Sequence, residues 1–327
     1  DLPVELAERV RLVIDPDAHR EAADGRVLRT VRDRARQLAR RADVEPGLGP
    51  HDVDLTALGA TLAPGFPDRI ARRIGATRGG FVTADGQPLS IDRGEAIHEA
   101  AGIVAVDIDT RSKRGAVHRA TALEAKLDHI VYATPDLAGT VARIRDEWGV
   151  TPTPGGSHDG MGTANALLAI GNDAYLEIIG PDPSQPDHVG PRPFGVDDVT
   201  EPRLITWAAA VPDLGLWLAW CAARKLDPGP AFAMQRTTPA GNVLHWRLTP
   251  PPSDGDGIVP FLIEWPGATP AATAVTGVEL FGFELSHPDL AVAGRLQEYA
   301  LPYPVTRSAA SLRAVLLTPA GMVTLES

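Results

Sequence analysis

The sequence predicts an α+β protein built around a repeated strand–helix–strand unit. The tripeptide Pro-Asp-Leu follows an apolar run three times, starting at residues 135, 212 and 288. The spacings of 77 and 76 residues are nearly constant, and such a period indicates an internal repeat. Of the 31 Lys+Arg and 42 Asp+Glu, 20 of each lie in residues 1–126, which leaves 11 basic and 22 acidic residues after them. The charge therefore changes where the first repeat begins, and we predict a domain boundary near residue 125.

Composition limits the class of protein. A chain of 327 residues exceeds what one hydrophobic core usually supports, so we expect two or more domains. No apolar run approaches the roughly 20 residues of a transmembrane helix, which predicts no membrane partner. Cys221 is the single cysteine, which excludes a disulfide framework and a cysteine-based metal site. With no secretory signal visible, the sequence predicts a cytoplasmic protein and a structural role for Cys221.

The N-terminal part, 1–125, is predicted to be helical over 1–75 and to form a small β structure over 76–125. Residues 2–14, 25–42 and 55–73 are predicted helices, the last one broken at 64–67. Residues 80–84, 102–109 and 116–123 are predicted strands, separated by glycine and polar residues, and they indicate a small antiparallel sheet or barrel. Arginines cover one face of the helix at 25–42, which suits a solvated surface or contact with phosphates.

The runs FPDRIARRIG (66–75), GGFVTADGQPLS (79–90) and AAGIVAVDIDTRSKRGAVHRATAL (100–123) resemble the accessory region of HrpB-like DEAH-box helicases. The chain has no GxxxxGK[ST] loop and no Asp-Glu-Ala-His box, so it lacks the parts that hold ATP phosphates. We interpret the segment as a piece of a larger helicase fusion or as a borrowed accessory module without ATPase activity. The resemblance implies RNA as a partner, with these contact residues: Arg32, Arg36, Arg40, Arg72 and Arg73.

The repeat region divides into three modules, at about 127–183, 204–267 and 277–327. Each is predicted to run strand, helix, then further strands, and the third is shorter. In the first module, LDHIVYATPDL (127–137) gives a buried strand and a helix start, with Thr134 as N-cap and Pro135 at the first helical position. A glutamate lies in the closing strand of each module, at Glu177, Glu264 and Glu326.

This βαβββ repeat, together with GGSHDGMGTANALLAIGNDAYLEIIGPDP (155–183) and VLHWRLTPP (243–251), resembles the glyoxalase-like, or vicinal-oxygen-chelate, superfamily. The resemblance implies two modules that form one cleft around a divalent metal. The metal would be held by a histidine on the first strand and a glutamate on the last strand of each module. Nitrogen and carboxylate ligands suit Fe, Mn, Ni or Zn.

Carried onto this chain, the resemblance assigns His129, Glu177 and Glu264 as metal ligands. The position of the second histidine is Thr206, which is a poor ligand. A buried histidine in the core is the alternative for His129, and a salt bridge is the alternative for Glu177.

Four further residues are candidates for binding a small molecule, and one for proton transfer. His158, in the glycine-rich segment 155–162, is the expected acid or base, or else a surface-loop histidine. Asn165, Trp207, His245 and Trp246 are the expected binding residues, with core packing as the alternative for Trp207. The proline-rich connection 180–202 is either a lid or a spacer.

The sequence therefore predicts a glyoxalase-like enzyme for a small metabolite with adjacent oxygens. Its metal-assisted chemistry would be of the isomerase, lyase or dioxygenase type. The alternatives are a metal-free binding module of the same fold and an RNA-associated fusion. A homodimer is a further expectation, because the short third module could complete its sheet with a second chain.

Overall fold

The computed structural model describes most of residues 67–123 and nearly all of 125–327. Val10, Asp33 and Leu62 are the described residues before these, and short gaps lie at 75–78, 84, 92–95, 101, 110, 112–113, 124, 172, 224, 239–240, 242, 254–255 and 299–302. The predicted helices at 2–14 and 25–42 thus lie almost wholly outside the described residues. The chain divides into two compact units, Asp1–Glu124 and Ala125–Ser327, and each is described by itself.

The first unit contains a closed five-stranded barrel with the strand order β1-β2-β3-β5-β4. The strands are β1 (Ile70–Arg73), β2 (Gly80–Thr83), β3 (Pro88–Ser90), β4 (Gly102–Asp109) and β5 (Gly115–Leu123). β1 pairs with β4 and closes the barrel, while β3 and β5 run parallel. Small Greek-key barrels of this size include the oligonucleotide-binding folds. Short 3-10 helices, Pro67–Arg69 and Ala96–Glu99, flank the strands.

The barrel interior explains why a helix is wrong for residues 70–73. Ala71 on β1 is fully buried and packs with Phe81, Leu89 and Ile103 in the barrel core. Alternation along β1 places Ala71 inside, and β1 pairs with β2 and β4 on its two edges. The apolar spacing that predicted a helix over 55–73 therefore gives way to a strand at its end, because pairing on both sides satisfies the backbone.

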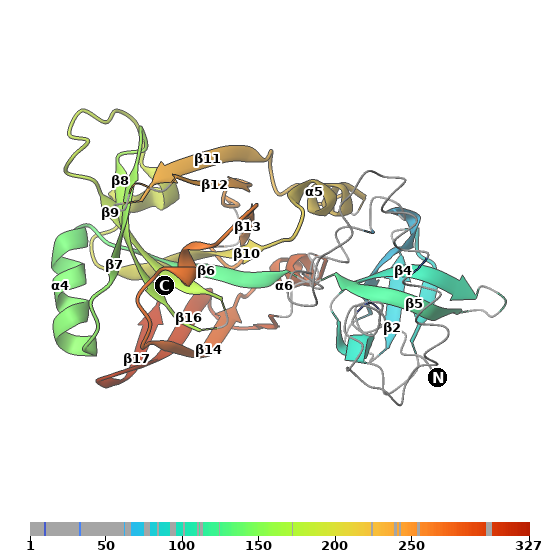
Figure 1. The fold of residues 1–327 in the computed structure, drawn as a ribbon. Helices are drawn as coiled ribbons and strands as arrows, with labels where there is room; N and C mark the ends of the chain where they lie inside the picture. Colours follow the sequence, from blue (N-terminus) through green and yellow to red (C-terminus); the bar gives the residue numbers. More distant parts are fainter. Residues whose placement is uncertain are drawn as a thin grey trace. The chain divides into compact units, whose positions relative to one another are not determined.

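The second unit is centred on one eight-stranded sheet with the order β11-β12-β13-β10-β6-β9-β8-β7 (Figure 1). β6 (Lys126–Ala133) and β10 (Arg203–Ala210) are its antiparallel centre and join modules one and two. Module one continues with β9 (Tyr175–Pro181), β8 (Thr163–Ala169) and β7 (Thr153–His158). Module two continues with β13 (Phe261–Glu264), β12 (Val243–Leu248) and β11 (Phe232–Thr237). The two outer strands, β7 and β11, contact each other, so the sheet curves round on itself.

Helices α4 (Leu137–Trp148) and α5 (Leu214–Ala223) follow the central strands of the two modules. The N-cap of α4 is Asp136, whose carboxylate accepts from the Gly139 amide, so the helix begins two residues later than predicted. Thr134 instead forms a turn, because its hydroxyl accepts from the Asp136 amide. α4 packs on β8 and β9, and Cys221 in α5 is buried.

Module three forms a separate four-stranded sheet with the order β15-β14-β16-β17 (Figure 1). Its elements are β14 (Glu279–Ser286), α6 (Leu290–Glu298), β15 (Val305–Thr306), β16 (Ser311–Thr318) and β17 (Gly321–Glu326). Here β14 pairs antiparallel with β16, whereas β6 and β10 run parallel to the closing strands of their own modules. The third Pro-Asp-Leu copy therefore keeps the strand and helix start but not the topology of the other two.

The third sheet packs against β10 through an aromatic cluster. Trp207 is fully buried and meets Phe283 and Tyr303 edge to face, at centroid distances of 5.4 and 5.1 Å. Its indole Nε1 donates to the Ile258 carbonyl at 2.8 Å. The described residues are mostly strand, with a few helices, and none of these helices is long and apolar enough to cross a membrane.

Candidate functional site

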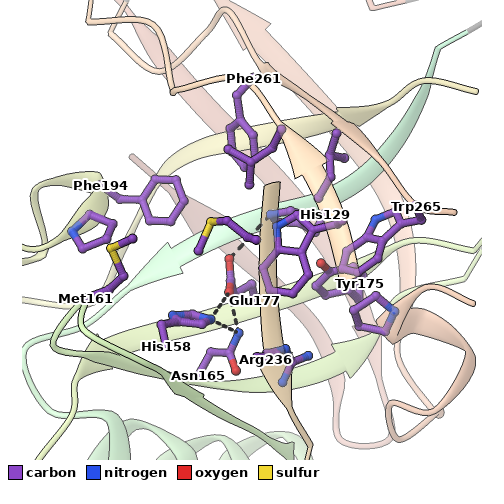
Figure 2. A pocket seen from close by; sticks show the side chains of 16 residues that line it. His129, His158, Met161, Asn165, Tyr175, Glu177, Phe194, Arg236, Phe261 and Trp265 are labelled. Atoms are coloured by element: carbon purple, nitrogen blue, oxygen red, sulfur yellow. Dashed lines mark hydrogen bonds and ion pairs between the residues drawn. The ribbon is translucent and has the colours of Figure 1, made fainter. Parts of the chain in front are cut away.

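A small cavity lies on the face of the eight-stranded sheet that carries His129 and Glu177 (Figure 2). Its volume is about 70 Å³, it is open on one side, and most of its lining is apolar. The polar groups at the cavity come from five strands, and they are His129, His158, Asn165, Glu177 and Arg236. A mostly apolar cavity with a few convergent polar groups is typical of small-molecule sites.

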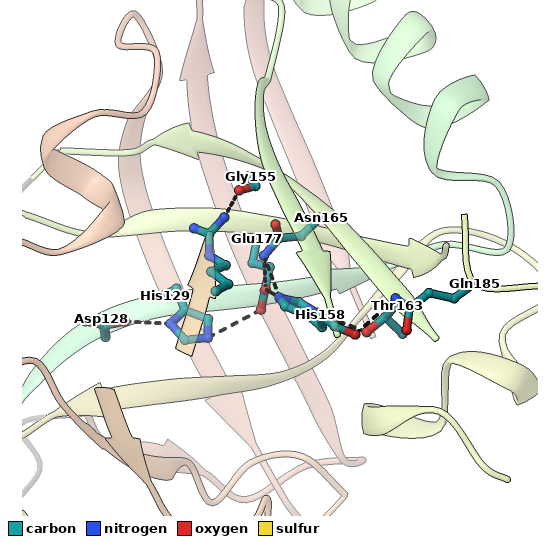
Figure 3. Close-up of polar contacts among 9 residues, drawn as sticks. Asp128, His129, Gly155, His158, Thr163, Asn165, Glu177 and Gln185 are labelled. Atoms are coloured by element: carbon teal, nitrogen blue, oxygen red, sulfur yellow. Dashed lines mark hydrogen bonds and ion pairs between the residues drawn. The ribbon is translucent and has the colours of Figure 1, made fainter. Parts of the chain in front are cut away.

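Glu177 is the centre of the polar group. It lies on β9 beside Val131 of β6, and its side chain is 9% exposed. One carboxylate oxygen lies 3.5 Å from His129 Nε2, and the other lies 3.9 Å from His158 Nε2 (Figure 3). The Asn165 amide donates to the same carboxylate at 2.5 Å. Strand alternation explains the burial, because Glu177 shares the inward face with Tyr175 and Ile179.

His129 is held by the residue before it in the chain. The Asp128 carboxylate lies 2.6 Å from His129 Nδ1 and also accepts from Trp265 Nε1 at 2.9 Å. A carboxylate can only accept, so Nδ1 carries the proton toward Asp128 and Nε2 faces Glu177. The Tyr175 ring stacks on the imidazole at 4.7 Å. Burial raises the pKa of Tyr175 well above its usual value, with the charges of Asp128 and Glu177 adding to this effect.

His158 lies at the end of β7, so the loop expected over 155–162 is in large part an edge strand. The strand has a bulge between Pro154 and Gly156, which accounts for the irregular, glycine-rich pattern. His158 Nδ1 lies 3.0 Å from the Thr163 hydroxyl, and its Nε2 lies 3.2 Å from the Asn165 amide nitrogen. The amide nitrogen can only donate, so Nε2 is the acceptor and Nδ1 holds the proton. Burial lowers the pKa of His158, which favours the neutral ring.

The segment after β9 holds the end of β7 in place. The Gln185 amide donates to the Ser157 hydroxyl at 2.8 Å and to the His158 carbonyl at 3.0 Å. Asp182 accepts from Gln185, Ser157 and Ser184. Burial raises the pKa of Asp182, but these hydrogen bonds outweigh it and hold the pKa well below its usual range.

Arg236 closes the cavity from the other edge of the sheet. It lies on β11, is 5% exposed, and its guanidinium donates to the Gly155 carbonyl on β7. This hydrogen bond joins the two outer strands of the curved sheet. Burial lowers the pKa of Arg236, while the charge of Glu177 acts in the opposite direction. A guanidinium remains protonated in proteins, so the cavity contains a fixed positive charge.

Aromatic side chains form the remaining walls. Phe261 meets His129 edge to face at 5.4 Å, and Phe194 lies 5.7 Å from Phe261. Trp246 and Trp265 lie 5.2 Å apart in the same lining. Phe194 belongs to the proline-rich connection and has a φ of 60°, a conformation that costs energy for a bulky residue. The connection thus supplies part of the cavity wall.

The structure brings together some of the residues predicted for the site and separates others. His129, His158, Asn165, Glu177 and Trp246 line one cavity. Glu264 lies on the other face of β13, where it pairs with Arg247 at 3.2 Å. Trp207 points to the third sheet, and His245 is exposed beside the inward-facing Trp246. Since neighbouring residues on a strand face opposite sides, Trp207 and His245 lie one residue away from inward positions.

Register explains why Glu264 is misplaced. Val131 pairs with Glu177 in module one, and the corresponding pair in module two is Ala208 with Phe261. Phe261 is therefore the repeat equivalent of Glu177, and Glu264 lies three positions beyond it. An odd offset along a strand moves a side chain to the opposite face. Matching the closing glutamates by sequence alone gave the wrong residue.

The donor set does not fit the metal site that the resemblance implied. Module two presents Thr206 and Phe261 where module one has His129 and Glu177, and the Thr206 hydroxyl is buried without a hydrogen-bond partner. Within the described part of the chain, no three His, Cys, Asp or Glu residues are arranged to hold a metal ion. The three predicted ligands His129, Glu177 and Glu264 cannot share one ion, because Glu264 is on the far face of the sheet.

Asp128, Tyr175 and Arg236 were not candidates from the sequence; Tyr175 and Arg236 line the cavity, and Asp128 contacts His129 from outside the lining. Asp128 adjoins His129 and alternates to the other face, where a carboxylate normally meets solvent, so its contact with His129 Nδ1 was not expected. Tyr175 was noted only as part of a strand. Nothing in the sequence marked Arg236, since its neighbours in the cavity are about 60 to 80 residues away.

The residues predicted to contact RNA belong to the first unit. Arg32, Arg36 and Arg40 lie outside the described residues, as does the side chain of Arg72, and Arg73 is half-buried on β1.

Two βαβββ modules thus share one curved sheet that carries a small, mostly apolar cavity, and the described chain is mostly β with few helices. The family model described as a glyoxalase-like domain matches residues 127–300, more than half of the chain. The chain therefore belongs to the glyoxalase-like domain family. No curated protein matches the chain.

Several solved structures match part of the chain. A hypothetical protein from Staphylococcus aureus is 15% identical, with a TM-score of 0.44 over 62% of this chain and 85% of that one. Methylmalonyl-CoA epimerase from Mycobacterium tuberculosis is 22% identical, with a TM-score of 0.31 over 43% and 88%. The E. coli DExH-box NTPase HrpB is 24% identical, with a TM-score of 0.24 over 47% of this chain and 17% of that one. The likeness to HrpB is thus partial, and none of the three carries a functional argument.

Proposed function

We propose that the chain is a glyoxalase-like enzyme that transfers a proton on a small oxygen-bearing metabolite, using Glu177 with His158 and His129. The observation that carries the proposal is a buried carboxylate with an imidazole Nε2 at 3.5 and 3.9 Å on its two sides, inside a mostly apolar cavity. Buried acid–base groups in such surroundings are typical of proton-transfer sites.

The chemistry is an isomerisation through an enolate. Glu177 accepts the proton from a carbon next to a carbonyl, and the electron pair of the C–H bond moves into the C=C–O⁻ system. Arg236 stabilises the oxyanion electrostatically. His158, neutral with Nε2 as acceptor, takes the proton from Glu177, and delivery of the proton to the opposite face of the same carbon gives the isomer. No oxidant is needed, and the atoms of substrate and product balance.

The metal-assisted form of this reaction was the prediction from sequence. It requires ligands that the described residues do not bring together, so no step is assigned to a metal. His129 has a different part here. Standing between Asp128 and Glu177, it orients the carboxylate and can move a proton between the two acids.

Hydrogen–deuterium exchange tests the proposal. The protein is incubated in D₂O with a panel of small oxo acids, hydroxy acids and aldehydes, and NMR follows exchange at the carbon next to the carbonyl. We expect at least one compound to exchange, with a rate that falls by roughly 10²–10⁴ in Glu177→Gln. The matched control is Glu279→Gln, an exposed residue of β14 that should leave the rate unchanged.

A second candidate is a binding module without catalysis. The presence of Thr206 and Phe261 at both module-two ligand positions favours it, because module two then contributes neither a metal ligand nor an acid–base group at these positions. Binding of a panel compound with no exchange above the protein-free rate would support this candidate and overturn the enzyme.

A further inference from the structure

We propose that Arg236 is the anion anchor of this cavity and that the ligand is a short-chain carboxylic acid with a carbonyl or hydroxyl group beside the carboxylate. That the bound acid is a substrate rests on the proposed function. That Arg236 binds its carboxylate rests on separate observations.

The first observation is a buried guanidinium without an acidic partner. Arg236 is 5% exposed, and its hydrogen bond goes to the neutral Gly155 carbonyl. Among the described residues, no Asp or Glu forms an ion pair with it. A cation largely removed from solvent gains from a nearby anion, and the Gly155 carbonyl engages only part of the five-donor guanidinium, which lines the cavity. A bound anion would supply what the protein does not.

The second observation is that Glu177 does not fill this role. Its carboxylate is engaged by Asn165 and flanked by the two histidines. Glu177 acts on the Arg236 charge from a distance, since its attraction opposes the effect of burial on the arginine pKa. The two groups therefore lie at one cavity as separate poles, and a substrate can place its carboxylate at one pole and its reacting carbon at the other.

The third observation is size and shape. A volume of about 70 Å³ corresponds to only a few water molecules, at roughly 10–15 Å³ each. The planar fork of arginine matches a carboxylate in two parallel hydrogen bonds. The walls, including Met161, Met234 and Phe194, offer only apolar contact to the rest of the ligand. Together these features select a short acid with one anionic end.

The test compares a short 2-oxo acid, 2-oxobutanoate, with its neutral amide and with inorganic phosphate. Binding to the whole chain is followed by the fluorescence of Trp246 and Trp265, which line the cavity, and by ligand-observed NMR. We expect the acid to bind at least tenfold more tightly than the amide, and phosphate to compete weakly. Arg236→Met should weaken acid binding by roughly 10- to 100-fold without changing amide binding, and Arg236→Lys should be intermediate. Arg247→Met, an exposed arginine on β12, is the matched control and should bind like the wild type.

The outcomes separate this inference from the proposed function. Equal affinity for acid and amide in the wild type would overturn it even if the Arg236 variants failed to fold, and so would the absence of binding by the acid at millimolar concentration. Phosphate binding more tightly than the acid would overturn the carboxylate assignment. Acid-selective binding without deuterium exchange would leave the inference standing and overturn the proposed enzyme.

Discussion

Asp128 offers a quantitative test of how the site is held. Its buried carboxylate accepts from His129 Nδ1 at 2.6 Å and from Trp265 Nε1 at 2.9 Å, and the Tyr175 hydroxyl is a further partner. Asp128→Ala leaves these donors without their acceptor, and a buried unsatisfied donor costs about 1–3 kcal/mol. Because Trp265 is only half-buried, its share is at the low end of that range. We expect the free energy of unfolding to fall by about 2–4 kcal/mol.

Asp128→Asn separates stability from function. The amide oxygen can still accept from Trp265, so the free energy of unfolding should fall by only about 1 kcal/mol. The amide NH₂, however, then faces His129 Nδ1 and reverses the tautomer of the ring, which places a hydrogen on Nε2 toward Glu177. The exchange rate should fall by roughly 10²–10⁴.

The assay is urea unfolding monitored by tryptophan fluorescence, alongside deuterium exchange. Asp146→Asn is the control, because this exposed residue of α4 pairs only with Arg145 at the surface and should change stability by less than about 0.5 kcal/mol. An Asp128→Ala protein within about 0.5 kcal/mol of the wild type would refute the reasoning. So would an Asn variant that loses as much stability as the Ala variant.

Three further predictions follow from other parts of the second unit. Trp207→Ala should cost about 3–5 kcal/mol of unfolding free energy, because it removes a fully buried ring between the two sheets. Ligand affinity should stay unchanged. A specific loss of ligand affinity in a stable variant would show that Trp207 belongs to the binding site. The folded-state pKa of Asp182 is depressed, so its stabilising contribution is present above the unfolded pKa of about 4 and is lost as the pH falls below it. Urea unfolding at pH 6 and pH 3 should therefore show a smaller acid-induced loss of unfolding free energy in Asp182→Asn than in the wild type. The exposed Asp159→Asn is the control. Deuterium exchange should survive dialysis of the protein against a chelator. Elemental analysis is the complementary measurement: about one divalent metal per chain, lost together with exchange in His129→Ala and Glu177→Ala, would contradict a metal-independent site.

The arrangement of the second unit followed from sequence where local chemistry repeats. The strand and helix start around each Pro-Asp-Leu triplet appeared close to the predicted residues, because strand burial and helix capping are local effects. The topology of module three did not follow. The same local pattern leads there to an antiparallel pairing of β14 with β16, since pairing depends on which strand edge is free in space.

The cavity residues likewise include some that local sequence indicates and others that it does not. His129 and Glu177 could be found because each is a polar residue on an apolar strand, a contrast visible in the sequence. Glu264 has a similar appearance, yet faces the other side, because strand register and not local composition selects the inward face. Arg236 left no such signal, as the curvature that brings β11 to β7 is a property of the closed sheet.

By itself, the sequence predicted a boundary near residue 125 and determined the repeat and the resemblance to the glyoxalase-like family, since these depend on composition, period and local motif. The tertiary structure alone decided which modules share a sheet, which face each strand residue occupies, and which charges meet in the cavity. Those features are set by hydrogen-bond register and by contacts between residues far apart in the chain. The carboxylate of Glu177 and the guanidinium of Arg236 therefore lie at one cavity only once the sheet has curved to bring its two edges together.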